Sequence, residues 1–234
     1  MTRLVFAAAT IVVLAVPGVA ACARNRDGTA VRAESSVSTG TSVTSSAPSR
    51  TVASDNPESS EPGVLETTPR PVPANSQVCA QDLTGQTATS AVADPAAPKI
   101  TVAVPDGWSV APGSGDVGAR FAGPDDMLAE ITISATALDP AAAFTRYSDD
   151  VMAKYPISTL SLLPAELCGY SGQKLMGTWA DDPDEYVEYQ DRIIHIWTNE
   201  KNYLVAIHVE APAGTTGFDV AASTLTSDFN IVLP

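Results

Sequence analysis

Aromatic side chains are absent from a long stretch near the start of the chain, and this restricts where a folded core can form. Residues 23–76 contain no Phe, Tyr or Trp, and 24 of these 54 residues are Ser, Thr or Pro. Such a segment cannot bury enough apolar surface to offset the conformational entropy that its ordering would cost. Residues 77–234 hold all three Trp, all six Tyr and four of the five Phe. We therefore predict a disordered spacer over residues 22–76 and one folded domain over residues 77–234.

The first 21 residues have the pattern of an export signal. Arg3 provides a short positive start, and residues 4–16 form an apolar run in which only Thr10 is polar. A Pro-Gly pair ends the run. It is shorter than the roughly 20 residues that a bilayer-spanning helix needs, and it is typical of a secretory signal. We predict a signal peptide over residues 1–21 and a protein that acts outside the cytoplasm.

The residues around Cys22 resemble a bacterial lipoprotein signal. An aliphatic residue, Val19, and two alanines stand directly before this cysteine. The resemblance implies that the signal is cleaved before Cys22, that the thiol receives a diacylglyceryl group and that the new amino group is acylated. Two or three acyl chains hold a protein stably on a membrane, whereas one chain binds only marginally. The alternative is ordinary signal cleavage near Ala21 or Ala23 without lipidation.

Cys79 and Cys168 are expected to form a disulfide. If Cys22 is lipidated, these two are the remaining cysteines, and cysteines of an exported protein are normally paired. The bond would close a loop of roughly 90 residues and would stabilise the domain by about 4.5 kcal/mol in the chain-entropy model. The alternatives are two buried free thiols or a shared metal ion, although the sequence has no CxxC motif and no histidine near either cysteine.

Hydrophobic periodicity predicts an α+β domain. Alternation of apolar and polar residues indicates strands over residues 99–104, 128–137, 173–180, 186–198 and 203–210. The last two flank a short polar turn and should form an antiparallel hairpin. Asp139-Pro140 is typical of a helix start, and a second helix is predicted from Phe218 to Phe229. One helix lies between strands and one follows them, so we predict an antiparallel sheet flanked by helices.

The order of these segments resembles that of the LpqN/LpqT-type lipoproteins of mycobacteria and related actinobacteria. The resemblance covers roughly residues 95–234. It is carried by the turn from Pro105 to Trp108 in ITVAVPDGWSV, by the Asp139-Pro140 helix start, and by the string GYSGQKLMGTW before a long hairpin. It implies a Mog1/PsbP-like fold, a cell-envelope location and a protein-binding role. It carries no catalytic residues over to this chain.

No pattern of residues predicts a catalytic centre. The string GYSG at residues 169–172 lacks the spacing of a nucleophile elbow, and we interpret it as a turn. The chain's two histidines, His195 and His208, lie on the two arms of the predicted hairpin. We interpret them as structural. A role as general base or metal ligand would need carboxylate partners, for which Asp191 and Glu210 are the candidates.

The acidic run and the tryptophans are the other candidates for a site. Residues 181–185 could attract Ca²⁺, but they lack the EF-hand pattern and its glycine, so we interpret them as a solvated loop at the end of a hairpin. Trp108, Trp179 and Trp197 are interpreted as core residues, with a place in a ligand pocket as the alternative. We predict no catalytic, cofactor-binding or metal-ligating residue.

The charge balance restricts the partners that the domain can have. Residues 77–234 contain 7 Lys and Arg against 21 Asp and Glu, which argues against a nucleic-acid partner. The leading hypothesis is a non-catalytic binding or adaptor module, lipid-anchored through Cys22 on the extracytoplasmic face of the cell membrane, whose partner is an unknown envelope or extracellular protein. The alternative is a carrier of a lipid or other apolar envelope ligand. A third hypothesis is a hydrolase with a dispersed site.

Overall fold

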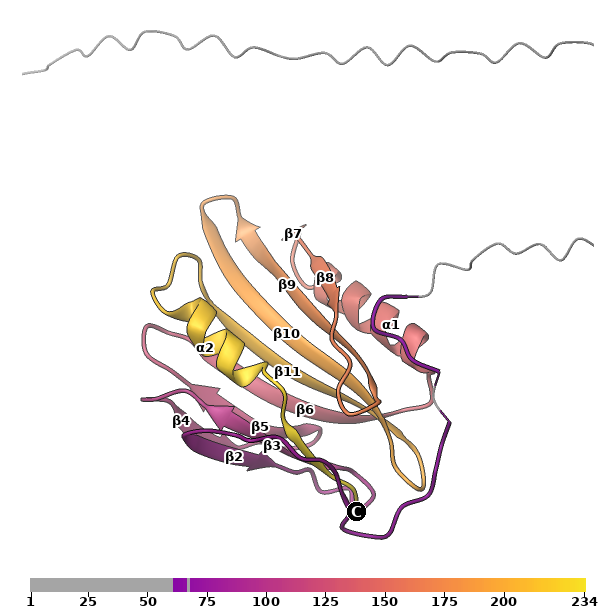
Figure 1. The fold of residues 1–234 in the computed structure, drawn as a ribbon. Helices are drawn as coiled ribbons and strands as arrows, with labels where there is room; N and C mark the ends of the chain where they lie inside the picture. The colour runs from indigo at the N-terminus through magenta and orange to yellow at the C-terminus, as the bar shows by residue number, and fades with distance from the viewer. Residues whose placement is uncertain (1–60, 67) are drawn as a thin grey trace, which may run out of the picture. The chain divides into compact units, whose positions relative to one another are not determined.

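Two antiparallel sheets and two helices make up the part of the chain that the structure, a computed structural model, describes: residues 61–66 and 68–234 (Figure 1). The predicted signal peptide, Cys22 and the spacer up to residue 60 lie outside the described residues. The predicted α+β class, with antiparallel sheets flanked by helices, is confirmed. No helix of the described part is both long and apolar enough to span a bilayer.

The larger sheet is built around three long strands, which correspond to the predicted segments 173–180, 186–198 and 203–210. Its strands are, in spatial order, β4 (Ser109–Pro112), β5 (Val117–Ala122), β6 (Leu128–Thr136), β11 (Asn202–Pro212), β10 (Glu185–Trp197), β9 (Ser171–Asp182) and β7 (Ile157–Ser158), with β8 (Ser161–Pro164) also paired to β9. The smaller sheet has the order β1 (Gln77–Cys79), β12 (Asn230–Val232), β3 (Lys99–Val104) and β2 (Gln86–Ser90). The predicted hairpin is the β10–β11 pair.

Both predicted helices are present, but the second is shorter than expected. Helix α1 (Pro140–Ala153) begins as predicted, because the Asp139 carboxylate accepts a hydrogen bond of 2.9 Å from the main-chain N–H of Ala142. Helix α2 (Phe218–Leu225) ends four residues before Phe229. The chain leaves the helix there and continues to β12. Phe229 is buried, but it lies in the segment that connects the helix to this strand.

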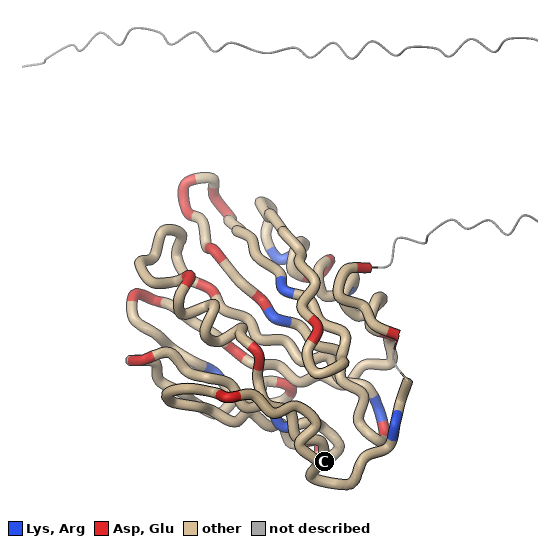
Figure 2. Tube along the Cα trace, viewed as in Figure 1, with Lys and Arg blue, Asp and Glu red and all other residues tan. Residues whose placement is uncertain are grey.

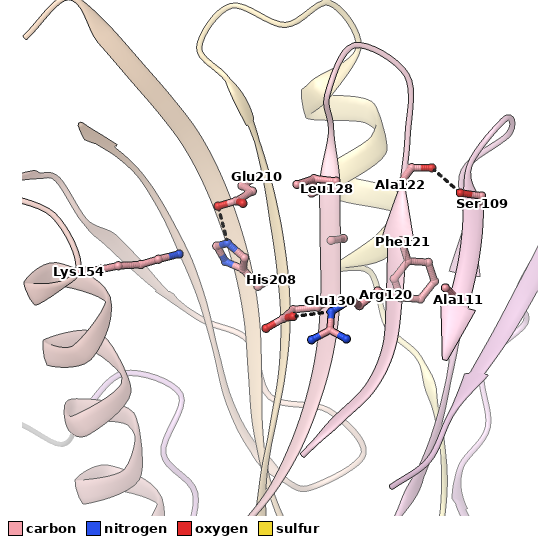
Figure 3. Close-up of a pocket in the computed structure, with 11 residues that line it drawn as sticks. Ser109, Ala111, Arg120, Phe121, Ala122, Leu128, Glu130, Lys154, His208 and Glu210 are labelled. Carbon is pink, nitrogen blue, oxygen red and sulfur yellow. Dashed lines mark hydrogen bonds and ion pairs between the residues drawn. The ribbon is translucent and has the colours of Figure 1, made fainter. Parts of the chain in front are cut away.

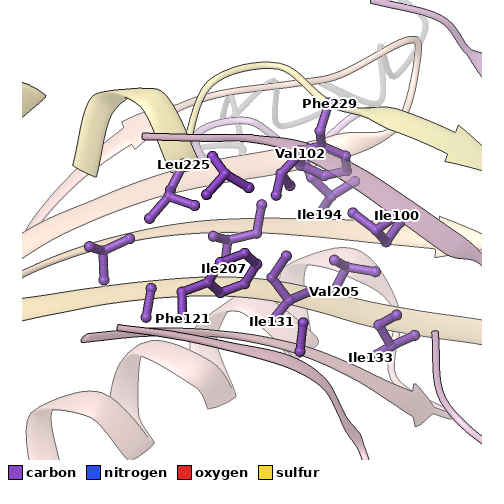
Figure 4. Close-up of a cluster of buried hydrophobic side chains, with 14 of the residues drawn as sticks. Ile100, Val102, Phe121, Ile131, Ile133, Ile194, Val205, Ile207, Leu225 and Phe229 are labelled. Carbon is purple, nitrogen blue, oxygen red and sulfur yellow. The ribbon is translucent and has the colours of Figure 1, made fainter. Parts of the chain in front are cut away.

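The main core lies between the two sheets and is closed by α2. Strand β3 of the smaller sheet and strands β6 and β11 of the larger sheet all direct alternate side chains into it (Figure 4). The labelled side chains of this core include Ile100, Val102, Ile131, Ile133, Val205, Ile207, Leu225 and Phe229. Each of them is almost completely buried. This core uses one face of the larger sheet only.

A smaller cluster forms on the opposite face of the larger sheet, beneath α1. It consists of Phe144 from the helix with Leu175, Ile193 and Ala206 from strands β9, β10 and β11. Because side chains alternate along a strand, β11 directs Val205 to the main core and Ala206 to this second cluster. The two helices therefore pack on opposite faces of the larger sheet, and α1 packs over β9, β10 and β11.

The ordered domain begins earlier than the predicted boundary at Gln77. Residues 61–66, which we assigned to the spacer, cross the start of β9 and bond to it. Gly172 donates its main-chain N–H to the carbonyl of Gly63 (2.9 Å), and Leu65 donates to the Ser171 hydroxyl (2.9 Å). Val64 packs against the cluster beneath α1. Composition missed this segment because its attachment depends on main-chain hydrogen bonds and one small apolar side chain.

The segment that follows is attached as well. The side-chain amide of Asn199, in the β10–β11 turn, donates to the carbonyl of Val72 (2.7 Å) and accepts from its N–H (3.1 Å). Further on, Leu233 donates its N–H to the carbonyl of Ser76 (2.9 Å). These contacts lead the chain from the α1 side of the larger sheet to strand β1.

Gly63 has no room for a side chain, and we expect Gly63→Ala to release residues 61–66. Its φ is +75°, and an added Cβ would lie 2.0 Å from the Gly172 carbonyl oxygen. Left-handed strain and the lost hydrogen bonds should together lower the free energy of unfolding by about 2–3 kcal/mol. Hydrogen exchange at the Gly172 N–H should accelerate. The control is Gly115→Ala, because Gly115 has a φ of +64° and nothing near its Cβ position. Equal losses in both variants would refute the packing explanation.

The predicted disulfide joins Cys79 to Cys168, with 5.6 Å between their Cα atoms. Cys79 is buried at the end of β1, whereas Cys168 is exposed. Cys168 and Gly169, with φ values of 51° and 83°, form the centre of a tight turn closed by hydrogen bonds between Leu167 and Tyr170. The first half of the GYSG string therefore lies in a turn, as predicted, whereas Ser171 and Gly172 begin β9. The bond links the first strand of the domain to the turn that precedes β9.

Candidate functional site

A hollow of about 410 Å³ opens on the α1 face of the larger sheet, beside the helix (Figure 3). Helix α1 packs over the β9–β11 side of this face, so β4, β5 and β6 remain accessible beside it. We call this hollow the sheet groove. It is lined by Ser109, Ala111, Arg120, Phe121, Ala122, Leu128, Ala129, Glu130, Lys154, His208 and Glu210. These residues come from four strands and from the residue after α1.

His208 occupies the side of the sheet groove nearest to α1, and the pairing of β10 with β11 determines which residue lies opposite it. The register of β10 and β11 sets Asp191 directly opposite His208. The Asp191 carboxylate lies 2.5 Å from Nδ1 of His208, and the Glu210 carboxylate, two residues along β11, lies 3.2 Å from Nε2. Asp191 is fully buried, while the His208 side chain is 18% exposed. Both ring nitrogens therefore face a carboxylate.

The two carboxylates determine the protonation state of His208. Burial alone would lower the pKa of the imidazole, but the hydrogen bonds to Asp191 and Glu210, and their negative charge, raise that pKa to about 9. The same contact with His208 lowers the pKa of Glu210. At neutral pH the ring is thus an imidazolium that donates both of its N–H groups. It has no lone pair with which to accept a proton from a substrate.

Groups beneath α1 hold this arrangement in place. The Tyr147 hydroxyl donates to the second oxygen of Asp191 (3.1 Å), and burial together with the Asp191 charge raises the pKa of Tyr147 well above its usual value. Trp179 stacks against His208 with 5.3 Å between the ring centroids. A second hollow, of about 230 Å³, shares Glu130, Lys154 and His208 with the sheet groove and continues beneath α1.

Two cationic side chains stand at the sides of the sheet groove. Lys154 reaches in from the end of α1 toward His208 (Figure 3), and its Nζ lies 4.1 Å from the centroid of the Trp179 ring. Arg120 pairs with Glu130 across β5 and β6 at 3.7 Å. Leu128, which lines the groove from β6, is 48% exposed. The groove thus combines an exposed apolar side chain with charged groups around it, which is the composition of a binding surface.

His195 does not belong to this site. Its Nε2 lies 3.0 Å from the carbonyl oxygen of Leu138, the ring is buried, and that burial lowers its pKa. It pairs in register with Leu204, four residues along β11 from His208. The structural interpretation fits His195. The ring of His208, in contrast, contacts Asp191 and Glu210, the two carboxylates that the sequence analysis names as possible partners.

The remaining candidates do not line the sheet groove itself. Residues 181–185 are exposed at the end of the β9–β10 hairpin, as predicted. Trp108 and Trp179 are buried, and Trp179 also borders the hollow beneath α1. Within residues 61–66 and 68–234, no group of three His, Cys, Asp or Glu side chains is placed to hold a metal ion.

Sequence reasoning missed the other charged residues of the groove. Arg120, Glu130 and Lys154 carry no motif, and they meet because β5, β6 and the end of α1 lie side by side. The contact between Asp191 and His208, in contrast, could have been predicted from the sequence. A hairpin centred on residues 199–200 places these two residues opposite each other.

The comparisons with known proteins show a shared fold. A scan against protein-family models finds no match, and no curated protein matches this sequence. Among solved structures, the chain is similar to LpqN of Mycobacterium tuberculosis, which is described as involved in cell envelope biogenesis. The TM-score is 0.50 at 18% sequence identity, over 63% of this chain and 91% of that one. This similarity supports a distant LpqN-like fold, in agreement with the fold that the sequence resemblance implied.

Proposed function

We propose that this chain is a cell-envelope lipoprotein whose folded domain is a non-catalytic binding or adaptor module, held on the extracytoplasmic face of the membrane through Cys22. The LpqN-like fold supports the envelope assignment, since LpqN is described as involved in cell envelope biogenesis. The signal pattern before Cys22 supports the anchor. The partner is an envelope or extracellular protein.

The contacts of both His208 ring nitrogens with carboxylates are the observation that carries the binding role. The sheet groove is open and large enough for a ligand, yet its histidine is an imidazolium with both nitrogens bonded to carboxylates. The hydroxyl of Ser109, which also lines the groove, donates to the carbonyl of Ala122 (3.3 Å). A hydrolase would need a nucleophile next to a free base. The groove offers fixed charges and apolar contact instead.

A carrier of a lipid or other apolar envelope ligand is the second candidate. The sheet groove exceeds the roughly 300 Å³ at which small-molecule sites begin. Leu128, Ala122 and Phe121 provide apolar surface in it. Against a carrier role, the groove is open to solvent and bordered by charged side chains, whereas ligand sites normally enclose most of an apolar ligand. The adaptor role requires no such enclosure.

The anchor is tested by the intact mass of the protein extracted from membranes, before and after reduction. We expect the native protein to carry fatty acids on Cys22 and to gain two hydrogen atoms on reduction of the Cys79–Cys168 bond. The variant Cys22→Ala should appear in the soluble fraction without acyl groups. Wild-type protein that is freely soluble and has no fatty acid on its first mature residue would contradict the anchor.

The binding role is tested by capture from an envelope extract in mild detergent. We expect the wild-type protein to retain a specific partner and Lys154→Glu to lose it, because the reversed charge stands at the side of the sheet groove. The matched control is Arg146→Glu, since Arg146 is exposed on α1 and lies outside the groove. If nothing is retained above background, the binding role is wrong.

A further inference from the structure

Strand β4 forms an open edge of the larger sheet. It pairs only with β5, and all four of its residues are exposed. The opposite end of the sheet is covered differently, because β7 and β8 both lie along β9 and residues 63–65 bond to its start. Edge strands with unpaired main-chain groups are templates for pairing with another chain.

The register of the β4–β5 pair tells which main-chain groups face outward. Gly113 donates its N–H to the carbonyl of Gly118 (3.4 Å), in line with the pairing of Ala111 to Arg120 and Ser109 to Ala122. Bonded and non-bonded pairs alternate along an antiparallel ladder. Val110 and Pro112 therefore direct their polar groups to the free side. That side offers the N–H and carbonyl of Val110 and the carbonyl of Pro112.

The usual protections of an edge strand are few here. Natural edges carry lysines or inward-pointing charges that prevent pairing. The sequence of β4, SVAP, has no charge, and Val110 is 40% exposed. Pro112 removes one donor at the end of the strand, so an added strand would be held over a few residues only. Such an edge suits a short, reversible contact.

The charges around β4 indicate the kind of segment it would accept. Asp106 precedes the strand, and Asp125 and Asp126 form the turn next to Ser109. Asp116, in the loop after the strand, instead accepts a hydrogen bond from Ser134 of β6, and Arg120, opposite Ala111, is paired with Glu130. Asp106, Asp125 and Asp126 are exposed, and no base of the described residues forms an ion pair with them. Figure 2 shows how sparse Lys and Arg are across the domain. Another copy of this acidic domain would be repelled, whereas a basic segment would be attracted.

We propose that β4 is a docking edge for an extended segment of a partner protein that carries Lys or Arg at alternate positions and adds to the sheet as an antiparallel or parallel strand. This inference rests on the proposed binding function and names the kind of partner. The main-chain bonds to Val110 and Pro112 hold the segment, and the carboxylates of Asp106, Asp125 and Asp126 select its charge.

The test uses the full-length protein and a blocked hexapeptide of alternating Lys and Val. On addition of the peptide, we expect hydrogen exchange at the Val110 N–H to slow, and binding to weaken as salt rises. Val110→Pro removes the only outward N–H and should weaken binding by about fivefold or more, since one hydrogen bond contributes about 1 kcal/mol. Val110→Thr keeps the N–H and serves as the control.

Other outcomes overturn the proposal. Equal binding of a peptide with Glu in place of Lys would overturn the charge selection, and unchanged exchange at Val110 would overturn the edge. A dimer of the protein that Val110→Pro dissociates would assign the edge to a second copy instead. If Val110→Pro retains an envelope partner that Lys154→Glu loses, this inference fails while the proposed binding function stands.

Discussion

Replacing His208 by Gln is expected to lower the free energy of unfolding at pH 7 by about 3–5 kcal/mol. The substitution leaves the carboxylate of Asp191 completely buried without its cationic partner, and breaking a buried pair from one side has a cost of this size. Urea unfolding of wild type and variant measures the loss. A double-mutant cycle with Asp191→Asn should show a coupling of about 2 kcal/mol or more. Additive effects would mean that the two groups do not interact energetically.

The same pair makes stability depend on pH in the alkaline range. The pKa of His208 is about 9 in the folded protein and 6.5 in the unfolded chain. The stabilisation is therefore fully present below about pH 6.5 and is lost as the pH rises through about 9. We expect a decrease on the order of 3 kcal/mol over this interval. His208→Gln should remove that part of the pH dependence, and a wild-type stability that stays level from pH 6.5 to 9.5 would contradict the assignment of an imidazolium.

The double variant Cys79→Ala/Cys168→Ala is expected to lose about 4–5 kcal/mol of stability. The bond joins residues 89 positions apart. Without this cross-link the unfolded chain regains conformational entropy, and for a loop of this length that lowers the free energy of unfolding by about 4–5 kcal/mol. Without it, strand β1 keeps its pairing with β12 and the bond from Leu233 to Ser76. Denaturant unfolding under oxidising conditions measures the difference.

Reduction of the wild-type protein is the control for the disulfide variant. Reduced wild type and double variant should unfold at the same denaturant concentration, because both lack the same constraint. A loss under about 1 kcal/mol in both would show that β1 is held by its pairing to β12 and that the chain-entropy account does not apply here.

Periodicity predicted β3, β6 and β11, which each have one face in the main core, but it missed the shorter strands β5 and β12, which also contribute to that core. In β6 and β11, apolar side chains recur at every second position because alternate residues enter the core between the sheets. Strand β2 was missed because its sequence, QTATS, has no large apolar residue and its strand structure follows from pairing with β3. The end of α2 was placed too late for a related reason. Phe229 fits the helical spacing after Leu225, but Asp228 bonds Arg192 of β10 at 3.0 Å and the chain turns into β12.

The amino-acid sequence by itself determined the position of the long hairpin, the start of α1, the pairing of the two domain cysteines and the separation of a core-forming part from a part without aromatics. The hairpin, the helix start and the separation of the two parts follow from local spacing and composition, whereas the cysteine pairing, between residues 89 positions apart, follows from the number of cysteines that remain once Cys22 is set aside. Only the tertiary structure decided the sheet groove, the attachment of residues 61–66 and the open edge at β4. They depend on which strand lies beside which, and the pairing of β6 with β11 brings together segments far apart in sequence. The order of the strands is selected by the burial of apolar side chains between the two sheets, and no single segment of the sequence indicates that order.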